Sequence, residues 1–492
     1  MKKLLLAKFI LALILLSLFS CSKKDEPLID TPTISSTTLA VNKFINESMT
    51  EDYLWTDKMP SVDYTKESDP KAYFKKLLYT TDDHWSFITD DYASLANSFQ
   101  GVEKSFGYSL AFGQFTGTSN YFAVVEYVNP NTPASTAGIK RGDIFIKIDG
   151  SNITESNYMN LFYKESVTLT KGTLTSQGIA TGGTVSLTGE ELTINPILMK
   201  KIINHGGKKI GYMVYNQFIG NYNDSIDKAV QYFKSQQIDD LILDLRYNPG
   251  GGVDAARHIC SCLAPQSAVN DQKLLVTYKW NTFLQSYFEN GLNTATKSGI
   301  QDDIDYYTSQ LKVNYDKSVA GNLNLSRLYV LTTRGTASAS ELTITGLRPY
   351  MNVTCVGDTT HGKYTASITI QPMVQKSDGS YVVDSNISNW AIQPIVLRYA
   401  NSNGVTDFKN GFVPDYYVND ELLPAVELGD STEPLLKKAL EQITGVQVIA
   451  MKTVSKPILP YRIIDRASSK YEQFHRNLIV PKLKTKTQKI LF

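Results

Sequence analysis

The sequence predicts an α/β fold (α+β multidomain), and three observations support this prediction. The 492 residues are enough for two to four domains and a sizeable core. From about residue 208, apolar β-rich runs alternate with amphipathic helical patterns, which favours β–α–β units in a largely parallel sheet flanked by helices. Before that point, a helical pattern and then a set of short strands indicate two smaller domains.

Changes in these patterns predict six segments. They are a signal peptide at 1–20, a flexible tether at 21–37, a helical N-terminal domain at 38–98, a β-rich domain at 99–196, a core at 197–425 with an insertion at 264–324, and a C-terminal helix and basic tail at 426–492. The 49 basic and 48 acidic residues are nearly balanced, so we expect no nucleic acid partner.

The signal peptide begins with two lysines and continues in the apolar run Leu4–Phe19. It ends at Leu18–Cys21, which resembles a bacterial lipobox, although Phe19 is bulkier than the residue usual there. This resemblance implies that Cys21 is lipidated and anchors the chain in a membrane. We expect a cell-envelope protein at the outer membrane, on its periplasmic or surface face. The alternatives are an ordinary secretory signal and an uncleaved anchor.

Three other cysteines remain, and an odd number argues against a disulfide framework. Cys260 and Cys262 lie in an apolar helical pattern and Cys355 in an apolar run, so we expect buried free thiols. No histidine or second cysteine pair gives metal-ligand spacing, so the sequence predicts neither a metal site nor a cofactor.

A candidate nucleophile lies in the stretch Gly335–Glu341, Gly-Thr-Ala-Ser-Ala-Ser-Glu, between an apolar β-rich run and a helical pattern. Small residues there permit a tight turn that leaves a serine hydroxyl at the helix entrance. Free backbone N–H groups and the helix dipole favour developing negative charge at this point. Ser338 is therefore a candidate nucleophile, and Ser340 competes with it. The alternative is a helix-capping loop rich in Ser and Thr.

A candidate base lies in the stretch Gly357–Lys363, which follows another apolar run. Lys363 lies 25 residues after Ser338, far enough for a helix, a turn and a strand to return it to the serine. A lysine amine in an apolar or positively charged pocket loses its proton readily and can serve as a general base.

A third stretch, Asp240–Gly252, has the pattern of a buried strand that runs into a glycine turn. Gly250 and Gly251 lack side chains, so their N–H groups can point at a bound carbonyl oxygen. They are candidates for an oxyanion hole.

Together these stretches resemble the S41 family, the carboxy-terminal processing peptidases of the Ser–Lys type. The family pattern D-L-R-x-N-x-G-G appears at Asp244–Gly251, G-[ST]-A-S-A-S-E at Gly335–Glu341, and G-x-x-[TS]-x-G-K at Gly357–Lys363. A fourth pattern, G-x-x-P-D-x-x-V, appears at Gly411–Val418. The resemblance implies a serine-type endopeptidase that hydrolyses peptide bonds in proteins and peptides through an acyl-enzyme, without a metal or cofactor.

In this reading Ser338 attacks the scissile carbonyl and Lys363 accepts its proton. The N–H of Gly250 or Gly251, with that of Ala339, stabilises the oxyanion. The alternative is a catalytically weak or inactive S41-like lipoprotein that only binds peptides, and retention of both the serine and the lysine favours the enzyme.

The motifs depart from the family pattern in one place. Many members carry a glutamine four residues after the lysine, where this chain has Ser367. Ser367 is the candidate orienting residue, with Thr365 behind it. Some S41 branches use an early histidine as the base, but His84 is more simply a structural residue here. We expect Glu341 to cap its helix or pair locally.

Residues 101–196 resemble a PDZ domain. Asn129–Asp143 holds a small helix followed by the pattern A-G-[IL]-x-x-G-D, and Ser166–Gly183, rich in Thr, Ser and Gly, has the composition of an insertion loop. PDZ domains add an extended peptide to a sheet edge and hold its terminal carboxylate with backbone N–H groups. The alternative is a PDZ fold that only packs against the protease and gates it. The expected peptide-binding residues are Phe106, Gly107, Tyr108 and Ser109.

Overall fold

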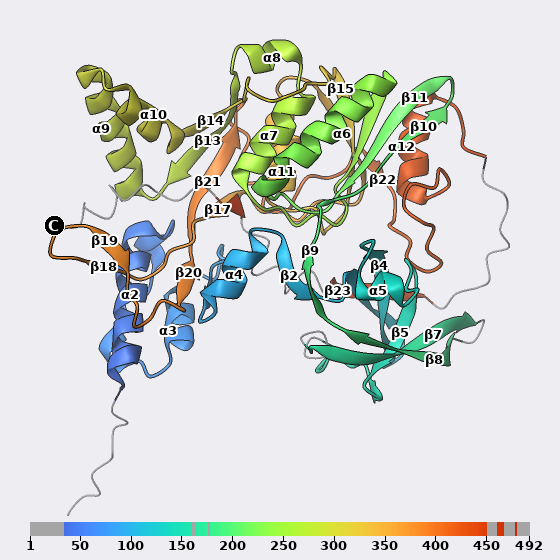
Figure 1. Cartoon of the computed structure of the whole chain (residues 1–492), viewed down its shortest axis with the longest axis horizontal. Coiled ribbons are helices and arrows are strands. Elements are labelled where there is room, and N and C mark those ends of the chain that lie inside the picture. Colours follow the sequence, from blue (N-terminus) through green and yellow to red (C-terminus); the bar gives the residue numbers. More distant parts are fainter. Residues whose placement is uncertain (1–33, 159–163, 176–177, 450–459, 467–477, 480–492) are drawn as a thin grey trace, which may run out of the picture.

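The computed structural model describes residues 34–158, 164–175, 178–449, 460–466 and 478–479. It has a helical N-terminal part, a β-rich part with its own core, and a larger core of sheets and helices (Figure 1). The expected signal peptide, the lipidation site Cys21, most of the tether and most of the basic tail lie outside the described residues.

The N-terminal part is built from short capped helices. The Ser35 hydroxyl accepts a hydrogen bond at the start of the first helix, and the Asp69 carboxylate accepts two N–H groups at the start of the next, which begins with Pro70. Its last strand pairs antiparallel with a strand of the core, which joins the two parts. The elements are α2 (Ser36–Asp52), α3 (Pro70–Leu77), β1 (Phe87–Thr89) and α4 (Tyr92–Ser98), and the core strand is β20 (Ala391–Gln393).

The β-rich part is a seven-stranded sheet around an apolar core that includes Leu110, Phe112 and Phe145. The order along the sheet is β23 (Tyr461–Arg466), β3 (Tyr108–Phe115), β4 (Tyr121–Val128), β5 (Ile144–Ile148), β7 (Ser166–Thr175) and β8 (Gly178–Thr188), with β6 (Ser151–Asn152) beside β5. A short helix, α5 (Pro133–Thr136), follows β4, and β2 (Val102–Ser105) pairs with β9 (Glu190–Thr193).

Strands β7 and β8 form a long antiparallel hairpin across Ser166–Gly183. The prediction of an insertion loop in this stretch is therefore wrong. Threonine is β-branched and fits a pleated surface well, and Val167 and Leu169 bury their side chains in the core of the domain. Alternating burial, more than polar composition, decides the structure of this stretch.

The larger core contains a six-stranded sheet in which every pair is parallel except β10 with β11. This confirms the largely parallel sheet. Helices α6, α7 and α11 cover one face and α12 covers the other (Figure 1). In sheet order the strands are β10 (Ile197–His205), β11 (Lys208–Tyr215), β12 (Asp240–Asp244), β15 (Arg327–Thr332), β16 (Asn352–Gly357) and β22 (Tyr416–Tyr417); the helices are α6 (Asn223–Gln236), α7 (Val253–Leu263), α11 (Ala339–Leu347) and α12 (Pro434–Thr444).

A second sheet, mostly antiparallel, holds the lysine loop and part of the insertion. The insertion also contains helices that were not predicted, because most of their residues are polar. The few buried residues share one face, as Leu284 and Phe288 do, four positions apart. The sheet order is β14 (Lys312–Asn314), β13 (Leu274–Trp280), β21 (Ile395–Asn401), β17 (Thr365–Ser367) and β24 (Leu478–Ile479); the helices are α8 (Gln266–Asn270), α9 (Thr282–Ser298) and α10 (Gln301–Ser309), and β18 (Met373–Gln375) pairs with β19 (Tyr381–Val383).

A buried cluster of charges fixes the chain just after β12. The Arg246 guanidinium donates to Asp244 at 3.0 Å, to Glu433 at 2.6 Å and to Asp420 at 3.2 Å. Arg141, from the β-rich part, donates to the same Asp420 at 3.0 Å. Although burial opposes ionisation, the two guanidinium groups hold the pKa of the Asp420 carboxyl below its usual range. This cluster docks the β-rich part onto the core.

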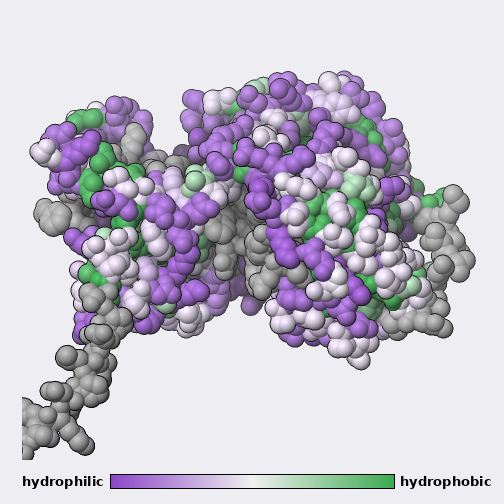
Figure 2. All heavy atoms as spheres, turned by 60° about the horizontal axis from the view of Figure 1, so that its bottom comes forward, coloured by the Kyte–Doolittle hydropathy of each residue, from purple (hydrophilic) through white to green (hydrophobic). Residues whose placement is uncertain are grey.

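The face of the molecule in Figure 2 is mostly hydrophilic, and apolar residues form small groups on it. Among the residues that the structure describes, we find no helix with the length and apolar character needed to cross a bilayer.

Candidate active site

Ser338 stands at the N-terminus of α11, after the turn that follows β15. Its φ of 61° and ψ of −111° are unfavourable for a non-glycine residue, and such backbone conformations cost about 1–3 kcal/mol. The side chain is buried, and its Oγ makes no hydrogen bond to any described residue. The turn therefore presents an unpaired hydroxyl at the positive end of a helix.

Ser340, the competing nucleophile, has a structural partner. Its Oγ donates to the carbonyl oxygen of Asn248 at 3.0 Å, and the N–H of Ala337 donates to the same oxygen at 3.1 Å. These two hydrogen bonds join the serine turn to the glycine turn. The geometry therefore favours Ser338 over Ser340 as the nucleophile.

The glycine turn packs directly against the serine turn. A Cβ atom on Gly250, whose φ is +112°, would lie 2.7 Å from the Cβ of Ser338 and 3.0 Å from the nitrogen of Ala339, so no larger residue fits. The N–H of Gly250 donates to Oδ1 of Asn248 at 2.8 Å. The N–H groups of Gly251 and Ala339 donate to no acceptor in the described part of the chain. These two are the available donors among the three predicted residues.

The carboxylate of Glu341 connects the serine turn to the lysine loop. Its Oε2 accepts the N–H of Ser338 at 2.9 Å and the N–H of Lys363 at 2.8 Å. Its Oε1 accepts the N–H of Gly362 and the hydroxyl of Thr360, both at 2.6 Å. Burial raises the pKa of the Glu341 carboxyl, and the four donors act in the opposite direction. The predicted capping role of Glu341 accounts only for its bond to the Ser338 N–H, because the other three donors belong to the lysine loop.

The hydroxyl of Tyr399, on β21, forms a second bridge between the same segments. It lies 3.2 Å from the carbonyl oxygen of Ser338 and 3.1 Å from that of Lys363. Burial raises the pKa of Tyr399 well above its usual value, so the hydroxyl remains a donor. Sequence reasoning missed this residue, because no motif marks it.

The lysine pocket is partly formed by the N-terminal part. The Nζ of Lys363 lies over the indole ring of Trp85, 5.7 Å from its centroid. The Trp85 indole N–H makes a long contact of 3.5 Å with Nε2 of His361. His84, the alternative base, is exposed and packs edge-to-face on Trp85 at 5.7 Å. The N-terminal domain therefore contributes directly to the surroundings of the lysine.

Thr365 and Ser367 lie on β17, two and four residues beyond Lys363. Their hydroxyl oxygens are buried and have no hydrogen-bond partner among the described residues. Neither hydroxyl therefore holds the lysine by a hydrogen bond in this conformation. The orienting role of Ser367 stays a prediction.

The site is closed in this structure. Neither Ser338 nor Lys363 has exposed surface, and the unpaired Ser338 hydroxyl is not hydrogen-bonded to the lysine amine. Their backbones are nevertheless bridged twice, by Glu341 and Tyr399. The two backbone segments are therefore held together while both side chains are covered.

The predicted peptide-binding stretch Phe106–Ser109 forms the turn that enters β3. Gly107 has a φ of +84°, and a Cβ atom there would lie 2.3 Å from the side chain of Thr132. The hydroxyl of Ser109 donates to Glu126 at 2.8 Å and is turned into the interior. Phe106 and Gly107 thus form a loop and Tyr108 begins β3, whereas the Ser109 side chain is committed to the domain itself.

The outer edge of β3 is occupied by β23, from the C-terminal segment of the same chain. The pairing is antiparallel and places Tyr461 opposite Phe115 and Arg466 opposite Ala111. The strand therefore runs towards the Phe106–Ser109 turn.

Cys260, Cys262 and Cys355 are buried free thiols, as predicted. Burial raises their pKa values, to about 12 for Cys260 and about 11 for Cys355, so these thiols are unreactive as nucleophiles.

Three family models match the chain in the order of its parts. The model for the peptidase S41 N-terminal domain matches residues 40–87, a PDZ model matches 124–170, and the model for peptidase family S41 matches 209–418. This chain belongs to peptidase family S41. It is a serine-type peptidase of the C-terminal processing kind and carries a PDZ domain.

Known C-terminal processing peptidases are similar in sequence to most of this chain. A carboxyl-terminal-processing protease of Synechocystis is 25% identical over 409 residues, covering 79% of this chain and 83% of the relative. A chloroplastic C-terminal processing peptidase of Tetradesmus obliquus is 25% identical, covering 71% and 68%. The crystal structure of an S41 protease from Bacteroides fragilis superposes with a TM-score of 0.63 at 27% identity, covering 82% and 97%.

We expect Glu341→Gln to impair the site of this S41 peptidase. An amide offers one acceptor oxygen, so at least one buried donor among the N–H groups of Ser338, Gly362 and Lys363 loses its partner. That loss lowers the free energy of unfolding by about 1–3 kcal/mol and lowers kcat, as measured by denaturant unfolding and peptide hydrolysis. Glu47→Gln, on the exposed face of α2, is the control. Unchanged stability and kcat in Glu341→Gln would show that the bridge is dispensable.

Proposed function

We propose that the chain is an endopeptidase in which Ser338 is the nucleophile and Lys363 is the general base. One observation carries this proposal: Glu341 and Tyr399 each bridge the two residues, while the Ser338 hydroxyl stays unpaired against the glycine turn. Full burial of an amine favours its uncharged form, which a general base requires.

The proposed reaction has two stages. The Lys363 amine takes the Ser338 proton as Oγ bonds to the scissile carbonyl carbon, and the resulting ammonium then protonates the leaving amine as the C–N bond breaks. In the second stage water attacks the acyl-enzyme, the same amine takes its proton, and Ser338 leaves as the hydroxyl. The N–H groups of Gly251 and Ala339 donate to the oxyanion in both stages.

Ser338→Ala and Lys363→Ala should each lower kcat by roughly a thousandfold or more, because each removes a group that forms or breaks bonds. Hydrolysis of casein and of fluorogenic peptides measures this. The controls are Ser235→Ala and Lys234→Ala, which lie near the end of α6. Wild-type activity in Ser338→Ala would overturn the mechanism. Peptide binding without turnover by the wild-type protein would favour the alternative, a binding lipoprotein.

We further propose that the PDZ domain captures substrate C-termini at the edge of β3. The terminal carboxylate of the substrate would lie at the Phe106–Tyr108 turn. Strand β23 supports this choice of edge, because it adds there antiparallel, as a peptide ligand would. The same pairing means that a substrate peptide must displace β23. The tail of the chain would then compete with the substrate.

The variant Ile463→Pro should bind a C-terminal peptide more tightly than wild type. Proline removes an N–H and disfavours β23, whose Ile463 packs on the face of the PDZ sheet that meets Leu422 and Leu423. Fluorescence anisotropy with a labelled peptide ending in valine measures affinity, with the amidated peptide and Ile464→Ala as controls. Equal binding of free and amidated peptides would exclude carboxylate capture. Equal affinity of variant and wild type would exclude competition by β23.

For localisation we propose a lipid anchor on Cys21, at the outer membrane. The pattern Leu18–Cys21 after the apolar run supports it. Cys21→Ser should move the full-length protein from the membrane fraction to the soluble fraction and abolish labelling with radioactive palmitate, with Cys355→Ser as control. Labelling of Cys21→Ser at the wild-type level would exclude this cysteine as the anchor.

A further inference from the structure

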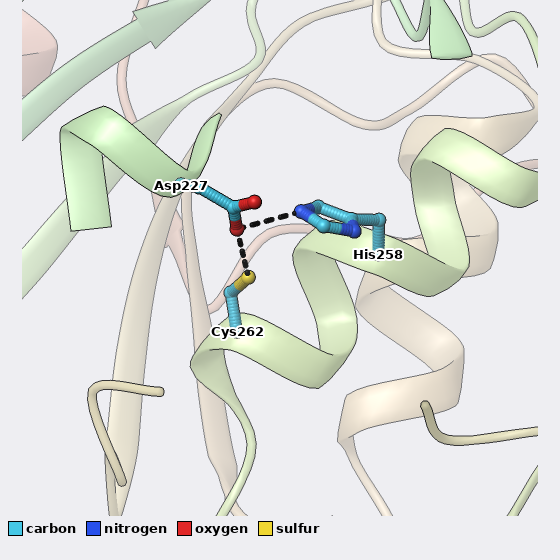
Figure 3. Close-up of side chains that lie close together, drawn as sticks. All are labelled: Asp227, His258 and Cys262. Carbon is cyan, nitrogen blue, oxygen red and sulfur yellow. Dashed lines mark hydrogen bonds and ion pairs between the residues drawn. The ribbon is translucent and has the colours of Figure 1, made fainter. Parts of the chain in front are cut away.

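Three side chains with metal-binding atoms converge between α6 and α7. Nε2 of His258 lies 2.9 Å from Oδ1 of Asp227, and Sγ of Cys262 lies 3.8 Å from the same oxygen (Figure 3). All three ligand atoms lie within 4.8 Å of one another. Sequence analysis missed this group because its carboxylate comes from another helix. His258 and Cys262 are four apart on α7 and therefore share one face.

These separations suit a tetrahedral ion. With bonds of about 2.0–2.1 Å to nitrogen and oxygen and about 2.3 Å to sulfur, neighbouring ligand atoms lie roughly 3.3–3.6 Å apart around one ion. The observed contacts of 2.9 Å and 3.8 Å lie on either side of that range. Small side-chain rotations, without movement of the helices, bring the three atoms to it.

The set of ligand atoms selects the class of metal. One thiolate, one imidazole and one carboxylate suit Zn²⁺ and its substitute Co²⁺, whereas Ca²⁺ and Mg²⁺ prefer oxygen alone. The group does not have the arrangement of a cysteine protease. Thiol and imidazole both contact the carboxylate, so the imidazole is not placed to take the thiol proton.

The cluster is also accessible. The side chains of His258 and Asp227 are 14% and 16% exposed, while Cys262 is buried beneath them. An ion can enter from solvent and keep a water molecule as its fourth ligand. The carboxylate of Asp316, which is near enough to act on Cys262 electrostatically, adds negative charge and is itself 3.6 Å from Arg257.

We propose that Asp227, His258 and Cys262 form a binding site for Zn²⁺. On binding, the thiol gives up its proton to solvent and the sulfur bonds to the ion. In the free site the His258 Nε2–H faces the Asp227 carboxylate. On binding, this proton is lost to solvent and Nδ1 takes one up from solvent, so the neutral imidazole carries its proton on Nδ1 and Nε2 binds the ion through its lone pair. No electron transfer is involved.

The position of the site gives the ion a structural role in the peptidase. Helix α7 begins directly after the glycine turn, and it packs against both α6 and α11. A bound ion ties α6 to α7 and so steadies the helix that follows Gly251 and Gly252. The cluster shares no residue with the proposed reaction centre, so the ion takes no part in the bond-making steps.

The test uses the purified full-length protein, freed of metal by chelation. Titration with Co²⁺ should give one tetrahedral d–d spectrum per chain, with a thiolate-to-cobalt charge-transfer band, and Zn²⁺ should displace it and raise Tm. Cys262→Ser should lose the charge-transfer band, and His258→Ala should bind about 100-fold more weakly or worse. Cys355→Ser, another buried thiol outside the cluster, should behave as wild type.

The outcomes separate clearly. No charge-transfer band and no Zn²⁺-dependent rise in Tm in the wild type would overturn the site, whatever the variants do. A band that persists in Cys262→Ser would place the metal elsewhere and would also overturn it. Because the readouts are spectral and thermal, the result does not depend on whether Ser338 is the nucleophile.

Discussion

The buried carboxylate of Glu341 is the interaction on which the rest of the site depends. Taking a carboxylate out of water costs several kcal/mol unless hydrogen bonds replace its hydration. Here four donors do so, and they come from both the serine turn and the lysine loop. The two segments therefore order together. A mechanism that needs Ser338 and Lys363 in register thus rests on a residue that touches neither reacting atom.

Buried charges also hold the PDZ domain against the core. Arg246 and Asp420 are buried and compensated only when β12, the start of α12 and the β-rich part are all in place. Tyr247, the next residue, donates to Asp420 and accepts from Arg141. The glycine turn follows at once. Any movement of the PDZ domain that disturbs Arg141 therefore acts on the chain that leads into the glycine turn.

Much of this arrangement could be predicted from the sequence, because the motifs mark backbone positions that tolerate few residues. Gly250 is forced by its approach to Ser338, and alternating strands and helices fix the parallel sheet. Other features depend on tertiary contacts that leave no local pattern. Tyr399 acts through its hydroxyl alone, and Trp85 reaches Lys363 from another part of the chain. The hairpin at Ser166–Gly183 was missed because polar threonines occur in loops and strands alike.

The sealed position of the Ser338 hydroxyl has one more consequence. A small electrophile that modifies active serines can react only with molecules in which the cover has moved. The rate constant of such labelling then measures how often the molecule opens. It does not depend on the protein concentration. The effects of PDZ ligands, of removing β23 and of adding metal between α6 and α7 can then be compared by one measurement, the labelling rate of the Ser338 oxygen.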